Sequence, residues 1–161
     1  MKVVVFGLTI SSSWGNGHST LWRGLCRALA ARGHWVVFYE RDVPYYAGAR
    51  DLYALPGGDL VLYAEWDEDL RRRAERDVAD ADVAIVTSYC PDGIAASDLV
   101  RSAPRAIAVF YDLDTPVTLS RLRQGETLTY IGKEGLSGFD LVLSYTGGAV
   151  LDELRDRFGA R

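Results

Sequence analysis

Short apolar runs alternate with amphipathic, helix-like segments along the whole chain, and this alternation limits the folds that the chain can adopt. The first apolar run, Val3–Phe6, is followed by a polar loop, by a helical pattern over Ser19–Arg32, and by a second apolar run, His34–Glu40. A strand, a helix and a strand in succession form a βαβ unit, whose strands are parallel and whose crossover is right-handed. The chain therefore begins as an α/β protein.

The same alternation continues to the last residues. Four more strands are predicted at Leu60–Tyr63, Val83–Val86, Ala106–Tyr111 and Phe139–Ser144. Four more helices are predicted at Trp66–Val78, Ile94–Ser102 and Val117–Leu122, and after Gly148, whereas Val43–Ala47 and Gln124–Ser137 read as irregular. The pattern predicts one doubly wound Rossmann-like domain over 1–161, with a mostly parallel sheet of about six strands in the order 3-2-1-4-5-6 and helices on both faces.

Composition excludes several classes of protein. The net charge of −4, without a basic cluster interleaved with aromatic residues, argues against nucleic acid as a partner. No apolar stretch approaches the ~18 residues of a membrane span, and the start of the chain does not resemble a signal peptide, so a cytoplasmic protein is expected. Cys26 and Cys90 are not in a Cys-x-x-Cys pair, and no metal site is expected.

The loop between the first strand and the first helix is the strongest candidate for a binding site. It is longer than the two to six residues usual for such a connection, and it carries hydroxyl groups, glycines, one Trp and one His. Ligands of open α/β sheets bind beyond the carboxyl ends of the strands, where this loop lies; the alternative is a merely long, flexible connection. The candidate binding residues of this loop are Ser11, Ser12, Ser13, Trp14, Gly15, Asn16 and Gly17, followed by His18.

Polar segments follow the other strands at the same edge of the predicted sheet. His18 is the candidate general base, because a free imidazole titrates near pH ~6.5. Asp112 or Asp114 is expected to fix its other ring nitrogen, although His18 as a loop or helix-cap residue and Asp114 as a simple helix cap are the alternatives. Further candidate ligand contacts are Tyr89, Asp92, Thr146, Gly147 and Gly148, of which the glycines supply backbone amides at a helix start.

Three well-known fingerprints are missing. Gly15-Asn16-Gly17 has Thr20 where a dinucleotide loop has its third glycine, and the chain contains neither Gly-Lys-Ser/Thr nor Gly-x-Ser-x-Gly. A nicotinamide dehydrogenase fragment that uses Glu40 to bind a ribose is therefore a weak third hypothesis.

Several segments together resemble the N-terminal half of GT-B glycosyltransferases, and most closely the bacterial spore-maturation-like (CgeB-like) group. The resemblance runs along the whole chain, and its more specific parts are the serine-rich loop and Asp-Leu-Asp-Thr-Pro. The segments that carry it are Met1–Gly7, Gly15–His18, Ala30–His34, Glu40–Tyr46, Thr87–Gly93, Tyr111–Pro116 and Ser144–Gly148.

The resemblance implies an acceptor-side domain that faces a C-terminal, donor-binding domain across a cleft. The complete enzyme would move a sugar from a nucleotide-sugar donor to a hydroxyl-bearing acceptor, with His18 near that hydroxyl. This chain would hold no cofactor itself and would be inactive without the donor-binding domain or a partner chain. A non-catalytic module that binds a nucleotide or a glycan is the alternative.

Overall fold

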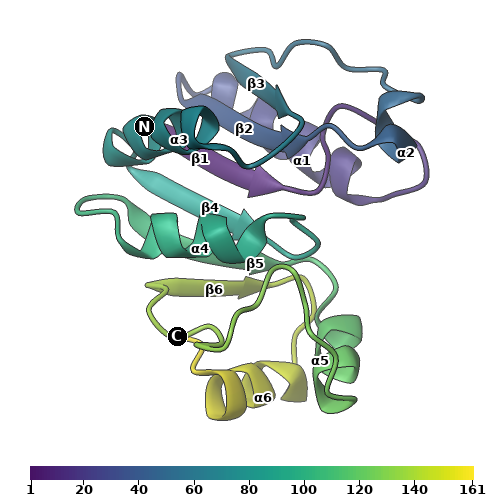
Figure 1. Ribbon diagram of the computed structural model, residues 1–161, viewed down its shortest axis with the longest axis vertical. Helices are drawn as coiled ribbons and strands as arrows, with labels where there is room; N and C mark the ends of the chain where they lie inside the picture. Colours follow the sequence, from purple (N-terminus) through teal and green to yellow (C-terminus); the bar gives the residue numbers. More distant parts are fainter.

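The protein is a doubly wound α/β domain, described over all residues 1–161 by a computed structural model (Figure 1). Its six strands are all parallel and lie in the order β3-β2-β1-β4-β5-β6, as the sequence predicted. The strands are β1 (Lys2–Gly7), β2 (Trp35–Arg41), β3 (Gly58–Tyr63), β4 (Val83–Thr87), β5 (Ile107–Asp112) and β6 (Leu141–Ser144). The helices are α1 (His18–Ala30), α2 (Pro44–Ala47), α3 (Glu68–Ala79), α4 (Gly93–Arg101), α5 (Thr115–Arg123) and α6 (Ala149–Phe158).

The strand order reverses at β1, which pairs with both β2 and β4. The chain first moves outward from β1 to β3 and then crosses back to β4, so the loops after β1 and β4 leave the sheet in opposite directions. In open α/β sheets this switch point opens a crevice beyond the carboxyl ends of the strands. The β1–α1 loop starts at this crevice.

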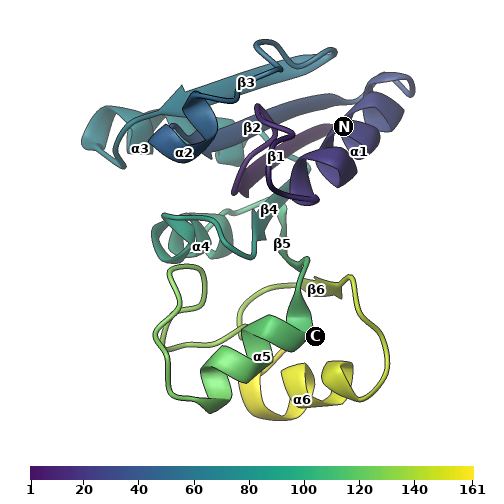
Figure 2. The same ribbon diagram turned by 90° about the vertical axis from the view of Figure 1, so that its right-hand side faces the viewer.

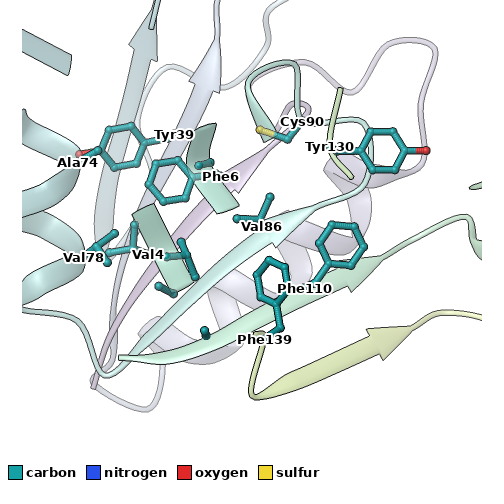
Figure 3. Close-up of a cluster of buried hydrophobic side chains, with 14 of the residues drawn as sticks. Val4, Phe6, Tyr39, Ala74, Val78, Val86, Cys90, Phe110, Tyr130 and Phe139 are labelled. Atoms are coloured by element: carbon teal, nitrogen blue, oxygen red, sulfur yellow. The ribbon is translucent and has the colours of Figure 1, made fainter. Parts of the chain in front are cut away.

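Two apolar clusters cover the two faces of the sheet. The larger cluster joins one face to α3, α4, α5 and α6 through side chains such as Ala74, Val100 and Leu154. Figure 3 shows its centre, where Phe6 lies beside Tyr39 with ring centroids 4.8 Å apart. The smaller cluster lies under α1, which Figure 2 shows on the opposite side of the sheet from α3 and α4.

Besides α1, the segment between α2 and β3 packs on the second face through Leu52 and Leu55, and part of that face stays open. Leu141 and Leu143 of β6 are paired with Val109 and Tyr111 of β5, so they extend the face that α1 covers. Leu141, Leu143 and the neighbouring Ile107 are 38–51% exposed. The helices α4, α5 and α6 pack on the other face. For α4 and α5, which connect β4 to β5 and β5 to β6, right-handed crossovers in one direction require this.

The structure corrects several local predictions. Val43–Ala47, predicted to be irregular, contains the short helix α2, with Pro44 in its first turn. Leu25 of α1 is 37% exposed, whereas Trp22 and Cys26 of the same helix are buried. Phe139 packs against Phe110 below the sheet, so β6 begins only at Leu141. None of the helices combines the length and apolarity needed to cross a membrane.

Candidate functional site

Glu40, at the end of β2, fixes the start of the β1–α1 loop. Its carboxylate is completely buried and accepts four hydrogen bonds. Oε2 accepts from the backbone N–H groups of Ile10 (2.7 Å) and Ser11 (2.9 Å), and Oε1 accepts from the hydroxyls of Thr9 (2.8 Å) and Ser11 (2.6 Å). Glu40 is therefore not free to bind a ribose, as the dehydrogenase hypothesis requires, because both of its carboxylate oxygens accept hydrogen bonds from the β1–α1 loop.

The serines of the loop hold its shape. Ser11 and Ser12 are fully buried, and the Ser12 hydroxyl donates to the carbonyl oxygen of Ala49 (2.9 Å). Ser13 is exposed and bonds the carboxylate of Asp51 through its hydroxyl and its backbone N–H. The sequence placed all three serines against a ligand, but only the exposed Ser13 lies at the surface, and its hydroxyl is already bonded.

His18 is the first residue of α1 and lies half-buried at the crevice. Its Nδ1 is buried without a hydrogen-bond partner, and the ring meets that of Tyr89 edge-on with centroids 5.5 Å apart. Burial lowers the pKa of His18 below its usual value, while the nearby negative charge of Asp114 acts in the opposite direction. The imidazole is therefore held in its neutral form, which can accept a proton.

Tyr89 connects the histidine to the aspartates. It occupies the left-handed backbone region at φ 63°, which is uncommon for a residue with a side chain. Its hydroxyl donates to Oδ2 of Asp114 (3.1 Å), the N-cap residue of α5. The direct hydrogen bond from His18 to a carboxylate, which the sequence led us to expect, is not formed; instead the ring of Tyr89 contacts His18 and its hydroxyl bonds Asp114.

Asp112 lies behind this layer and is completely buried. Its Oδ1 accepts from the backbone N–H of Asp114 and from the hydroxyl of Thr118, both at 3.1 Å, whereas Oδ2 has no partner. Burial raises the pKa of this carboxyl group above its usual value. Asp112 thus shapes the turn that presents Asp114 and does not face the crevice itself.

Two open cavities of about 440 Å³ each lie on either side of His18. Both volumes are typical of small-molecule sites. The first cavity is lined by Gly17, His18, Thr20, Leu21, Leu113 and Tyr145. The second, which we call the aspartate cavity, is lined by Leu8, Asn16, Gly17, His18, Tyr46, Tyr89, Leu113 and Asp114.

Other predicted site residues lie elsewhere. Asp92 accepts from Arg41 (3.2 Å) and from the Tyr63 hydroxyl (3.0 Å), so it ties the end of β4 to β2 and β3. The loop Thr146–Gly148 precedes α6 at the same edge of the sheet but lines neither cavity. Sequence reasoning missed the apolar side chains of both cavities. A signal existed for Tyr46, Leu113 and Tyr145, which lie in the segments that follow β2, β5 and β6 at this edge of the sheet.

No group of three or more His, Cys, Asp or Glu side chains is placed to hold a metal ion. The fold and the two cavities define a Rossmann-like α/β protein whose ligand-sized site lies at the carboxyl edge of its sheet. Comparisons with family models, with curated proteins and with solved structures gave no match to this chain.

Proposed function

We propose that this chain is the acceptor-binding domain of a GT-B glycosyltransferase. The observation that carries the proposal is the imidazole of His18, whose buried Nδ1 has no hydrogen-bond partner and which lines two ligand-sized cavities at the switch point of the sheet. The sequence resemblance supplies the reaction class, and the geometry supports a base at the position that the resemblance assigns to it.

In the proposed reaction an acceptor hydroxyl attacks the anomeric carbon of the donor sugar. The new C–O bond forms as the bond to the nucleoside diphosphate breaks, and the hydroxyl proton passes to His18. Because Nδ1 is buried, Nε2 is the nitrogen that receives the proton. The lowered pKa of His18 favours the neutral imidazole, and in the tautomer that carries its proton on Nδ1 the lone pair of Nε2 is free to act as the general base.

The proposal includes a second, donor-binding half, either a further domain or a partner chain, which brings the nucleotide-sugar. It also includes a cytoplasmic location. Neither part of the proposal requires a resident cofactor in this chain, since the nucleotide-sugar is a substrate.

The test uses the protein made from the complete reading frame and measures nucleoside diphosphate release from uridine-, guanosine- and thymidine-diphosphate sugars. His18→Ala should lower kcat at least ~100-fold, the usual contribution of a general base. His34→Ala is the matched control, because His34 lies at the opposite edge of the sheet against the terminal amine (3.2 Å). Full activity of His18→Ala would show that His18 is not the general base. If no donor gives release of nucleoside diphosphate, the proposed function is wrong.

One observation favours a second candidate, a non-catalytic sugar- or nucleotide-binding module. No hydrogen bond orients His18, whereas bases in enzymes are usually held by a second group. Calorimetric titration of this chain separates the two. Tight binding of a nucleotide-sugar without a second domain would favour the module.

A further inference from the structure

Two exposed aromatic side chains lie in contact beside the aspartate cavity, and we call them the aromatic shelf. Trp14 of the β1–α1 loop is 55% exposed, Tyr45 of α2 is 58% exposed, and their ring centroids are 4.8 Å apart. Figure 1 shows this loop running beside α2. Large aromatic rings contribute most when they are buried, so an exposed pair next to a cavity marks a surface that binds something.

The shelf is continuous with the site. The ring of Tyr46 meets that of Tyr45 at a right angle, with centroids 4.9 Å apart, and Tyr46 is also part of the lining of the aspartate cavity. A ligand that lies on Tyr45 and Trp14 can therefore extend past Tyr46 toward His18.

The loop holds the shelf in place before any ligand arrives. Gly15 has φ +70°, and a Cβ there would lie 3.0 Å from the Tyr45 hydroxyl, so glycine allows the close approach of α2. The Asn16 amide donates to the carbonyl oxygen of Trp14 (3.1 Å), and its oxygen accepts from the backbone N–H of Ser19 (3.1 Å). A preorganised surface loses less entropy on binding.

Charge argues for an uncharged ligand. Neither cavity beside His18 is lined by Lys or Arg, and the only charged group in the lining of the aspartate cavity is the carboxylate of Asp114. The nearby guanidinium groups of Arg23 and Arg50 already bond Asp51 and Asp42. A phosphate-bearing ligand would find no free counter-charge here.

We propose that the aromatic shelf binds a pyranose ring of a neutral carbohydrate acceptor and directs its hydroxyls toward His18. This inference rests on the proposed function and names its acceptor class. A pyranose has C–H groups on one face, which the negative face of an aromatic ring attracts, and hydroxyls around its rim. Tyr89 and Asp114, which both line the aspartate cavity, supply oxygen atoms that can accept hydrogen bonds from those hydroxyls.

The binding test follows the indole N–H signals of the four tryptophans of this chain by NMR, with the Trp14 signal assigned through Trp14→Phe. The probes are the methyl glycosides of glucose, galactose, mannose and N-acetylglucosamine, and uridine diphosphate. At least one glycoside should shift the Trp14 signal saturably. Trp14→Ala and Tyr45→Ala should each weaken that binding at least tenfold, whereas Trp35→Ala, which removes a comparably exposed (47%) tryptophan at the other edge of the sheet, should not.

Three results overturn the inference: no glycoside shifts Trp14, both shelf variants bind as the unchanged chain does, or only uridine diphosphate shifts Trp14. Kinetics of the complete protein separate this failure from that of the proposed function. If both shelf variants transfer the sugar with an unchanged acceptor KM, the proposed role of the shelf is wrong and the proposed transferase activity stands. If sugar binding depends on the shelf but no donor supports transfer, the proposed role of the shelf stands and the proposed transferase activity is wrong.

Discussion

The buried carboxylate of Glu40 allows the sharpest prediction about the architecture of the site. Glu40→Ala removes the acceptor of four hydrogen bonds and leaves two backbone N–H groups and two hydroxyls without their partner. A net contribution of about 1 kcal/mol for each hydrogen bond gives a loss of ~4 kcal/mol in the free energy of unfolding. Such a loss is a large fraction of the ~5–15 kcal/mol by which a domain of ordinary stability is folded.

Glu40→Gln should cost much less, about 1–2 kcal/mol. One glutamine oxygen can accept from Ile10 and Ser11 in place of Oε2, and its amide can donate to the hydroxyls of Thr9 and Ser11, which can rotate to accept. Only the extra strength of a charged acceptor is lost. The order of stability should be wild type, then Gln, then Ala.

The assay is urea unfolding followed by far-ultraviolet circular dichroism, with hydrogen exchange of the Ile10 and Ser11 amides as a local readout. Exchange of both amides should accelerate in Glu40→Ala. Glu65→Ala serves as the control, since Glu65 is exposed and should change stability by no more than ~0.5 kcal/mol. If Glu40→Ala unfolds within 0.5 kcal/mol of the wild type, roughly the noise of such measurements, then Glu40 does not fix the loop.

Three further predictions concern stability. A Cβ at Gly58 would lie 2.1 Å from the carbonyl oxygen of Val36, so Gly58→Ala should lower the free energy of unfolding by ~3 kcal/mol or more. Gly24 lies within α1 with open space around it, so Gly24→Ala should raise the free energy of unfolding by roughly 0.5–1 kcal/mol. Chemical denaturation of the two variants checks both expectations. The folded state lowers the pKa of His18, so the neutral imidazole stabilises the fold above the pKa of the unfolded chain, near 6.5, and this stability is lost as the pH falls through the folded pKa. His18→Gln should therefore lose less stability than the wild type between pH 8 and pH 5. Equal losses in the two proteins would contradict this. Burial raises the pKa of Asp112, so the stability that its protonated carboxyl group contributes is lost as the pH rises through the folded pKa. Asp112→Asn should therefore be at least as stable as the wild type in thermal unfolding at pH 8. The difference in stability between the two proteins should shrink toward pH 4.

The candidate site divides into residues that the sequence could identify and residues that it could not. His18 and Tyr89 follow strands at a switch point, so pattern reasoning alone brings them to one edge of the sheet. Which hydroxyls face a ligand is a matter of side-chain direction and burial. The polar loop therefore suggested three serine contacts, whereas Ser11 and Ser12 are completely enclosed.

The sequence by itself determined the class of fold, the strand order and the edge of the sheet where the polar loops gather. These follow from local periodicity and from the handedness of crossovers, which act on neighbouring segments. Only the tertiary structure decided that Glu40 accepts hydrogen bonds from the β1–α1 loop, that the Tyr89 hydroxyl donates to Asp114, and that the ring of Trp14 contacts that of Tyr45. Each of these contacts joins residues 25 or more positions apart, and such pairings depend on how the packed elements meet and leave no periodic trace in the sequence.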